Sequence, residues 1–424
     1  MGNDTYGEWF MRALLRFLRF VVQIQGFIVT SGGVSDDKAT VVIRGKRHGN
    51  AKPRCPECGD ILQGVIKMMT RRWRHLDLCG QACFIEAEIR QGFCKAHGKR
   101  VERVPWAAPG CRHTHAFDHQ VASFVRVADK SAASETFSVT WRTVGRIVTR
   151  VVSALMPRHP LADLTRITID ETSHKRGHRY ITVVSCLDTG RVVWVGKGKS
   201  SATLHVFFDE LGEKRTGLLE VIATDLGAAF TKVVKERAPQ ADLVYDRFHV
   251  VQLLTKAIDE IRREECRQLE GEAKKAIKSS RFALLRNPKH RTPKDIETIE
   301  RISNANETLF DAYQLRVDFE ELWECDDTIE ARAFLGRWGR DVLKSPHKPL
   351  HKFIHTVRRH LDGILGFFRQ DGVTSAVAEG LNNKIKLIIH RAFGFADIGA
   401  LMAMIHLCCG RIELPTQRRA NIWA

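Results

Sequence analysis

The sequence predicts an α/β protein built around a mixed β-sheet, because the hydrophobic period changes twice along the chain. From residue 164 onward, β-branched and apolar runs take the short period of strands, and Asp188-Thr-Gly190 between two runs indicates a hairpin turn. An amphipathic helix at 202–211 and a helix ending near Glu236 separate the later runs. Strands in hairpin order followed by alternating helices and strands favour a mixed sheet with helices on its faces. The expected strands lie at 165–170, 180–187, 192–195, 218–224 and 242–245.

The regions on either side of this sheet have a different character. Residues 248–370 carry no strand signal and predict successive helices, including 250–271 and 351–369, and a last helix follows at about 374–389. The first 115 residues are rich in Cys, His, Arg and Gly, with strand-like pieces at 39–44 and 84–90. Helices are expected at 117–130, 132–136 and 141–156. The chain is therefore divided at 1–115, 116–160, 161–249, 250–370 and 371–424.

The charge of the chain points to a polyanionic partner. Its 424 residues include 67 Lys and Arg against 49 Asp and Glu, a formal net charge of +18. A field of that sign attracts nucleic acid. A general solubility charge is the alternative, but the basic residues recur inside helical patterns rather than in a tail.

Neither a membrane span nor a secreted disulfide framework fits the sequence. No apolar run reaches the roughly 20 residues that a span needs. The nearest candidate, residues 10–29, is interrupted by Arg12, Arg16 and Arg19 at helical spacing, which predicts an amphipathic helix instead. The eleven cysteines occur without a secretion signal, and several have metal-type spacing. We expect a reducing, cytoplasmic setting.

Two short motifs near the N-terminus predict a structural zinc site. Cys55 and Cys58 are two residues apart and precede a glycine, and Cys94 and His97 repeat that spacing after 35 residues. Together they supply the four ligands of a tetrahedral zinc site. Alternatively Cys94 and His97 are ordinary packed residues and other side chains complete the site or form a second metal locus. Those other candidates are Cys79, Cys83, Cys111, His113 and His115.

The helices before the sheet have the pattern of a helix-turn-helix. The segment 141–156 presents an apolar face that includes Val144, Ile147 and Val148. Trp141, Arg142 and Arg146 point elsewhere, where a recognition helix would meet the major groove of DNA. A solvated amphipathic helix without that function is the alternative.

Three carboxylates lie where buried segments end or turn polar, in the order Asp170, Asp225 and Glu379. Asp170 and Asp225 follow apolar strands and become neighbours if those strands pair at the sheet centre. Glu379 shares a helix face with Asn382, Asn383 and Lys386, opposite a stripe formed by Val377, Leu381, Ile385 and Ile388. Carboxylates gathered in this way hold the two divalent ions of a phosphoryl-transfer site.

Other roles for these carboxylates stay open. Asp170 and Asp225 could be turn or helix N-cap residues, and Glu379 could be a solvated helix residue. Glu171 should point to the opposite face of a continuing strand. Asp246, at the end of the last strand in Tyr245-Asp-Arg-Phe-His249, is a competing ligand.

With these motifs the chain resembles the DDE transposases of bacterial insertion sequences in the ISL-three lineage. The resemblance covers nearly the whole chain, and two helical segments of the middle region share it. It is carried by Cys55-Pro-Glu-Cys58-Gly, Ile169-Asp-Glu171, Asp246-Arg-Phe-His249 and Ala376-Val-Ala-Glu379-Gly-Leu-Asn-Asn-Lys384-Ile-Lys386, with Phe282–Pro288 and Ala312–Leu315 in the middle region.

The resemblance implies a ribonuclease-H-like core with the catalytic triad Asp170, Asp225 and Glu379, interrupted by an all-helical insertion between its last strand and last helix. Members bind terminal inverted repeats, cut at the element ends with Mg²⁺, or with Mn²⁺, and join the free 3′ hydroxyls to target DNA. The chain departs from the usual pattern at one position, because His97 stands where members present the last cysteine of a second Cys-x-x-Cys.

We accordingly expect metal ions on the triad to activate water and then the DNA 3′ hydroxyl, without a covalent protein intermediate. The zinc module and helix-turn-helix would recognise the ends, while Lys384, Lys386 and Arg391 contact phosphates. A homodimer or larger synapse is expected because two ends are cut in one complex. The rival functions are a DNA-binding regulator or domesticated protein without cleavage activity, and a junction-resolving or other ribonuclease-H-like nuclease.

Overall fold

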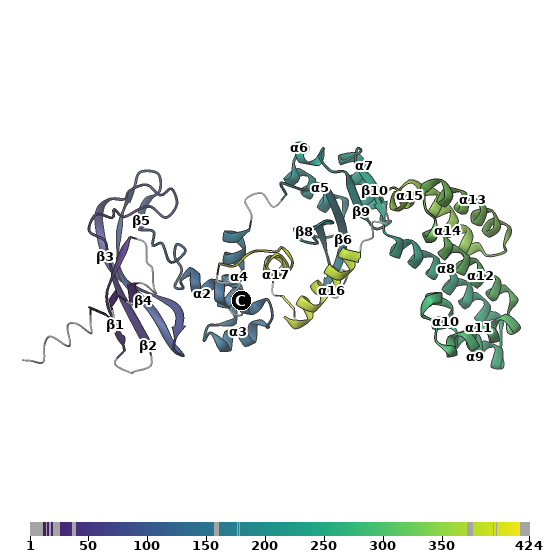
Figure 1. Ribbon diagram of the computed structural model, residues 1–424, viewed down its shortest axis with the longest axis horizontal. Coiled ribbons are helices and arrows are strands. Elements are labelled where there is room, and N and C mark those ends of the chain that lie inside the picture. Colours follow the sequence, from purple (N-terminus) through teal and green to yellow (C-terminus); the bar gives the residue numbers. More distant parts are fainter. Residues whose placement is uncertain are drawn as a thin grey trace, which may run out of the picture. The chain divides into compact units, whose positions relative to one another are not determined.

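The computed structural model divides the chain into two compact units, Met1–Met156 with Ile412–Ala424, and Pro157–Arg411 (Figure 1). It describes residues 12–13, 15–16, 18–19, 26–35, 40–156, 161–175, 177, 179–370, 376–392, 394–395 and 397–415. Within these ranges no helix combines the length and the apolar character that crossing a membrane requires.

The first unit contains a five-stranded sheet that the sequence indicated only in part. Its strands are β1 (Phe27–Val34), β2 (Thr40–Arg47), β3 (Gln63–Leu78), β4 (Gln81–Cys94) and β5 (Gly98–Val101), in the order β1-β2-β4-β3 with β5 beside β4. The strand-like pieces at 39–44 and 84–90 fall in β2 and β4. Trp73, Ile85 and Trp106 form part of the buried core on one face.

The amphipathic helix expected at 10–29 is wrong at its C-terminal end. Phe27 and Val29 are buried at alternate positions and belong to β1, which pairs with β2, so the period there is that of a strand. Among the described residues, 12–13, 15–16 and 18–19 are helical. The other positions of that prediction lie outside the described residues.

Three helices follow in the same unit: α2 (His115–Val125), α3 (Lys130–Thr136) and α4 (Trp141–Leu155). Thr114, Asp129 and Thr140 cap their N-termini by accepting backbone N–H groups. The helix expected at 117–130 ends earlier, at Val125, and the helix expected at 132–136 begins at Lys130, because Asp129 caps its N-terminus. Ile412 and Leu414 are buried in this unit, and Arg126 donates a hydrogen bond to the Ile412 carbonyl.

The second unit contains the mixed sheet that the sequence predicts. Its strands are β6 (Arg166–Lys175), β7 (Arg179–Cys186), β8 (Val192–Lys197), β9 (Val221–Thr224) and β10 (Asp242–Tyr245), in the order β10-β9-β6-β7-β8. β6, β9 and β10 are parallel, and β7 and β8 are antiparallel to their neighbours. β6 continues five residues past Asp170, so that carboxylate lies inside the strand rather than at its end.

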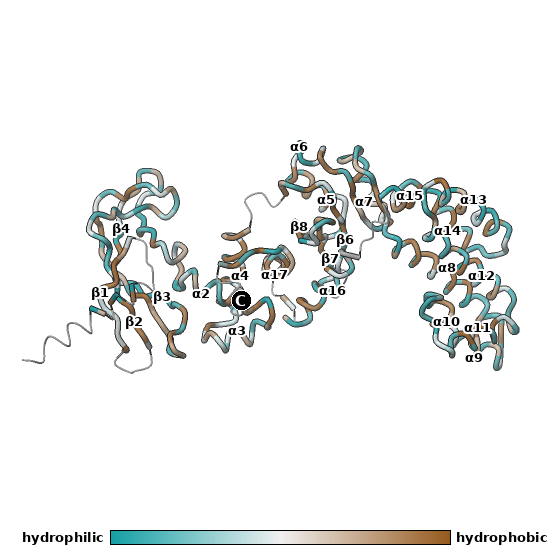
Figure 2. The backbone as a smooth tube through the Cα atoms, viewed as in Figure 1, coloured by the Kyte–Doolittle hydropathy of each residue, from teal (hydrophilic) through white to brown (hydrophobic). Residues whose placement is uncertain are grey.

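Helices cover both faces of this sheet. Ile169 and Trp194 share a core with Phe207 of α5 (Ser201–Leu211). The helix α7 (Ala228–Arg237) packs beside β9. In the sequence, the short helix α6 (Glu213–Thr216) lies between α5 and α7. Successive side chains of a strand point to opposite faces. The other face of β6 meets α16 (Ala376–Arg391), and α17 (Ile398–Cys409) packs against β8. The hydrophobic strands and α17 stand out in Figure 2.

Successive helices connect β10 to α16, as the sequence predicts. The expected helix at 351–369 is two helices, which meet at His360. Gly363 and Gly366 let α15 lie directly on β10, since a Cβ atom at Gly366 would come within 2.6 Å of the Leu243 carbonyl oxygen. The helices are α8 (Arg247–Gln268), α9 (Gly271–Ser279), α10 (Arg281–Leu285), α11 (Pro293–Ala305), α12 (Glu307–Asp318), α13 (Thr328–Lys344), α14 (Lys348–Arg359) and α15 (Leu361–Arg369), with 3-10 turns at Pro288–His290 and Phe319–Glu324.

Candidate metal and nucleic-acid sites

The two N-terminal motifs come together as one metal-binding cluster. Ligand atoms of Cys55, Cys58, Cys94 and His97 all lie within 4.8 Å of one another. The Cys58 and Cys94 sulfurs are 3.5 Å apart, and His97 Nδ1 is 3.6 and 3.8 Å from the Cys94 and Cys55 sulfurs. Sulfur ligands at about 2.3 Å from a tetrahedral zinc ion are about 3.8 Å apart. The predicted Cys₃His set therefore fits zinc in both donor chemistry and size.

The surroundings of this cluster also fit a bound metal ion. His97 presents Nε2 to Glu57 at 3.5 Å, and Arg100 fixes Glu57 through a 2.6 Å hydrogen bond. A metal-ligating histidine ordinarily donates its second ring N–H to such a carboxylate. The hydrogen bond with His97 lowers the pKa of the Cys94 thiol, which favours the thiolate form at this ligand. The pKa of the neighbouring Cys58 thiol is raised: a backbone hydrogen bond at Asp60 lowers it, but burial and the contacts with Cys94 and Cys55 outweigh that effect.

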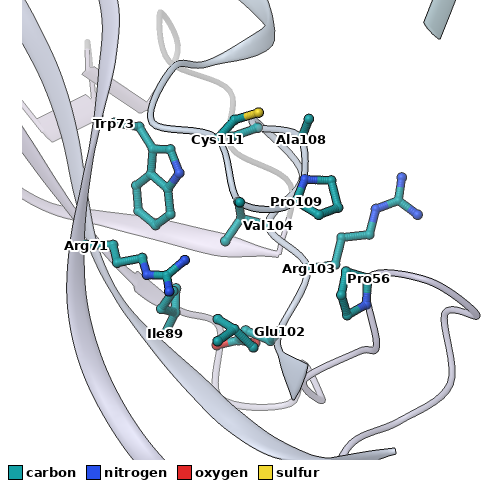
Figure 3. Close-up of a pocket in the computed structure, with 13 residues that line it drawn as sticks. Pro56, Arg71, Trp73, Ile89, Glu102, Arg103, Val104, Ala108, Pro109 and Cys111 are labelled. Atoms are coloured by element: carbon teal, nitrogen blue, oxygen red, sulfur yellow. The ribbon is translucent and has the colours of Figure 1, made fainter. Parts of the chain in front are cut away.

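The alternative zinc ligands lie elsewhere. Cys83 is buried in the sheet core, and His113 lies 3.9 Å from Asp118. Cys111 lines a small cavity of about 230 Å³ with Trp73 and Val104 (Figure 3). Across the described ranges, no second cluster of three or more metal-ligating side chains occurs.

The three-helix segment presents the expected basic face on α4. Arg142 and Arg146 are exposed one turn apart, and the buried face of the helix includes Val144, Ile147 and Val148. Trp141 is 40% exposed, and the Lys130 ammonium group lies 4.4 Å from its ring centroid. The two arginines therefore have the freer side chains, while Trp141 also contributes a cation–π contact between α3 and α4.

A buried ion pair holds α4 to α2. The Asp118 carboxylate accepts hydrogen bonds from Arg150 Nε at 2.7 Å and from a terminal nitrogen at 2.8 Å. Only 2% of the Asp118 side chain is exposed. Because both nitrogens bind one carboxylate, this contact fixes the angle at which α4 projects.

We expect Asp118→Asn to destabilise this three-helix segment by about 3 kcal/mol, because it leaves the Arg150 charge without its partner. Faster hydrogen exchange of the α2 and α4 amides would measure the loss. Glu135→Gln, at an exposed position of α3, is the matched control. Equal exchange rates in the two variants would contradict the assignment of stability to this ion pair.

The aspartates of the second unit lie side by side on neighbouring strands. In the parallel registers Ile169 is opposite Thr224, and Thr224 is opposite Tyr245. The next residue of each strand or strand end is Asp170, Asp225 and Asp246 respectively. The sheet therefore presents three carboxylates in a row at one edge of its parallel strands.

Each aspartate of this row has a defined environment. Asp170 accepts the Glu171 N–H at 2.6 Å and the Asn382 side-chain amide at 2.6 Å. Asp225 accepts the Gly227 N–H at 3.0 Å. Asp246 is buried and caps α8 by accepting the Phe248 N–H at 3.0 Å.

Burial raises the pKa of Asp170, and the negative charge of Asp225 raises it further. The hydrogen bonds from Glu171 and Asn382 and the charge of His249 act in the opposite direction. Carboxylate oxygens are the ligands that Mg²⁺ and Mn²⁺ take up in proteins. A divalent cation beside Asp170 and Asp225 would offset both burial and like-charge repulsion, so the donor set fits such an ion.

Glu379 lies on the first turn of α16 and is exposed. Its carboxylate does not form a cluster within 4.8 Å with Asp170 and Asp225 among the described residues. Asn382, three residues further along α16, binds Asp170 and accepts a hydrogen bond from Thr172. Residues three apart on a helix lie on the same face. The face of α16 that carries Glu379 is therefore turned toward β6.

The other expected site residues of α16 differ in their freedom to bind DNA. The Lys384 ammonium group donates to the Cys408 carbonyl at 2.8 Å and so binds the C-terminal end of α17. Lys386 is exposed, and Arg391 is half-buried. Glu171 points away from Asn382 and forms an ion pair with Lys199 at 3.1 Å.

Sequence reasoning gave no role at this site to Asn382 or His249. Asn382 was recognised only as a member of the polar face of Glu379. Asn382 is three residues from Glu379 and therefore lies on the same face of the helix. Because Glu379 was expected near Asp170, this spacing could have predicted the contact between Asn382 and Asp170. His249 lies one turn after Asp246 at the start of α8, with Nε2 3.9 Å from the Asp246 carboxylate.

Comparisons with known proteins agree in all three parts of the chain. A DDE-type family model described as a transposase matches residues 167–405. A model described as the helix-turn-helix domain of transposase family ISL3 matches 102–152, and a zinc-finger model of the IS204, IS1001, IS1096 and IS1165 transposases matches 51–97.

Curated relatives of nearly the same length are similar over most of the chain. The transposase of insertion sequence element IS1557 from Mycobacterium tuberculosis is 32% identical over 409 residues, covering 89% of this chain and 91% of the relative. The transposase of IS1001 from Bordetella parapertussis is 28% identical over 347 residues, covering 81% and 85%.

The mixed sheet with its aspartate row, the helix-turn-helix and the zinc cluster thus define a transposase. More narrowly, the chain belongs to the ISL3 family of DDE transposases. The expected family, zinc module and mixed core are confirmed, and the helix-turn-helix places DNA among its partners.

Proposed function

We propose that the protein binds the terminal inverted repeats of its insertion sequence, cleaves the element ends and joins their 3′ hydroxyls to target DNA. The observation that carries the proposal is the parallel register that puts Asp170 and Asp225 on neighbouring strands. Family membership supports the reaction class, and the fit of the carboxylates to divalent ions supports the metal dependence.

Asp170, Asp225 and Glu379 would hold Mg²⁺ or Mn²⁺, which when bound supplies Lewis-acid activation of the attacking oxygen and charge stabilisation of the leaving oxygen. Asn382 orients the Asp170 carboxylate by hydrogen bonding. The α16 face brings Glu379 to the same side of the sheet. Asp246 caps α8 and lies next to Asp225, which keeps it as an alternative to Glu379.

DNA recognition is assigned to the first unit. Arg142 and Arg146 of α4 would reach base edges, with Trp141 beside them, while the zinc cluster holds the neighbouring strands in place. Lys386 and Arg391 would contact phosphates near the carboxylates. Lys384 is assigned a weaker role in phosphate binding, because its ammonium group already donates a hydrogen bond to α17. We propose a homodimer or larger assembly, since two ends are joined in one complex.

The test is a strand-transfer assay with labelled duplexes that carry the inverted repeats flanking the gene, plasmid target and Mg²⁺ or Mn²⁺. Joined products support the proposal. Specific binding of the repeats without cleavage or joining would make the protein a DNA-binding regulator. Cutting of branched or hybrid substrates without any need for the repeats would make it a general nuclease.

Asn382→Ala is expected to lower joining about 10- to 100-fold, the usual cost of removing a residue that orients a metal ligand. Repeat binding should stay unchanged, and a higher Mg²⁺ concentration should restore part of the rate. Asn383→Ala, at the exposed neighbouring position, is the control. A loss without any change in metal dependence would point to a structural role for Asn382.

A further inference from the structure

A basic cavity of about 550 Å³ lies in the second unit, away from the residues assigned above. Its walls come from the β6–β7 hairpin, the end of β8 and the start of α17. His174, Lys175, Arg179 and Lys197 are among the residues that line it. Ile398 and Leu401 of α17 are among the apolar residues of the lining.

Three cations of this cavity form no ion pair in the part of the chain that the structure describes. Among the described residues, the side chains of Lys175, Arg179 and Lys197 take part in no hydrogen bond or ion pair. Other basic residues of the same sheet are paired, such as Arg166 with Asp188 at 3.1 Å. Exposed basic side chains that line one cavity repel one another, so a bound anion would relieve the repulsion.

The other titratable groups of the lining do not neutralise this charge. Burial, followed by the charges of Lys175, Arg179 and Lys197, lowers the pKa of His174, so its imidazole is neutral near pH 7. Asp397 is the acidic residue of the lining, and its carboxylate caps α17 by accepting the Ala400 N–H at 2.8 Å. The side chains therefore leave a net positive cavity.

The cavity lies near the aspartate row along β6. His174 is four residues after Asp170 on β6, or about 13 Å at about 3.3 Å per residue. A distance of this size is within the reach of one DNA strand, whose charged phosphates follow one another closely along the helix.

We propose that this cavity holds the phosphodiester backbone of DNA close to the carboxylates. The inference rests on the proposed function and deepens it by assigning Lys175, Arg179 and Lys197 to phosphate binding. The same contact would serve either the DNA of the element end or the target DNA, which present the same backbone.

The test compares two triple variants with wild type. Lys175→Gln, Arg179→Gln and Lys197→Gln remove the cavity charges, which are all exposed. The control variant, Lys214→Gln, Lys232→Gln and Lys235→Gln, removes three exposed charges from α6 and α7, which belong to the opposite face of the sheet. Fluorescence anisotropy measures the affinity of each for a duplex with the inverted repeat and for a duplex of unrelated sequence, without divalent metal, as KCl is raised.

The cavity variant should reduce the slope of log affinity against log salt by about 2 to 3, since each lost phosphate contact removes about 0.9. The control should keep the wild-type slope. A reduction confined to the repeat duplex assigns the cavity to element ends, and one confined to the unrelated duplex assigns it to target DNA. Equal slopes for the two variants on both duplexes overturn the proposal. Because the salt dependence of binding needs no cleavage, it tests phosphate binding by the cavity even if the wild-type protein joins no DNA in the strand-transfer assay.

Discussion

Asp225→Asn is expected to abolish strand transfer, by about 10³-fold or more, while repeat binding stays close to wild type. The amide is nearly the same size as the carboxylate and can still accept the Gly227 N–H, which supports local folding. The substitution removes the negative charge next to Asp170 that would be needed to bind a divalent cation. A 10³-fold loss corresponds to about 4 kcal/mol of transition-state stabilisation. Joining of labelled ends to plasmid DNA measures the first effect, and gel shift with the same ends measures the second.

Glu171→Gln is the matched control for this experiment. Glu171 is adjacent to Asp170 in the sequence, but it faces the opposite way and binds Lys199. It should therefore retain most of the joining activity. Wild-type joining by Asp225→Asn would contradict the catalytic assignment.

Asp246→Asn tests the competing ligand. Asp246 is register-matched to Asp225 and caps α8. A loss of joining in Asp246→Asn together with full activity in Glu379→Gln would transfer the third ligand role from Glu379 to Asp246. Loss in Glu379→Gln alone keeps the triad as proposed.

The core of the second unit was predictable because each of its elements is encoded locally. β-Branched runs gave the strands, and the rule that hairpins precede alternating helices and strands gave the mixed sheet. The adjacency of Asp170 and Asp225 followed once their strands were assumed to be central neighbours, and the structure has that pairing. The continuation of β6 to Lys175 was missed, because its outer half is polar and pairs only with β7.

The first unit was harder to predict because its sheet depends on distant pairing. β2 and β4 are parallel neighbours although about 40 residues separate Val42 from Phe84, and no local pattern encodes such a contact. β3 spans 16 residues but is largely exposed, so it lacks a clear apolar alternation. The burial of Ile412 and Leu414 in this unit is equally remote in sequence. The zinc ligands, in contrast, can be recognised from the sequence alone, because their spacing is fixed by coordination geometry.

Replacement of a zinc ligand should have the second large effect, on the fold of the first unit rather than on chemistry. Cys94→Ser is expected to release the zinc ion, because the hydroxyl does not replace a thiolate ligand. Cys94 ends β4 and Gly98 begins β5, so loss of the ion should also loosen that hairpin. Apparent zinc-binding free energies of about 10–16 kcal/mol in small zinc modules indicate how much of the local folding free energy depends on the ion. Metal analysis of the purified protein and hydrogen exchange of β4 and β5 measure the two effects.

Cys79→Ser separates this site from its alternative. Cys79 is exposed and lies outside the four-residue cluster, so its variant should keep one zinc ion per chain and wild-type exchange in β5. If Cys79→Ser lost the ion and Cys94→Ser retained it, the ligand assignment would be wrong. The second unit provides an internal reference in both variants, because its sheet has its own core and contains none of the four ligands. Unchanged exchange in β6 and β9 alongside faster exchange in β4 and β5 would show that zinc acts on the folding of the DNA-recognition unit alone, and Cys94→Ser should then lose repeat binding while its aspartate row stays intact.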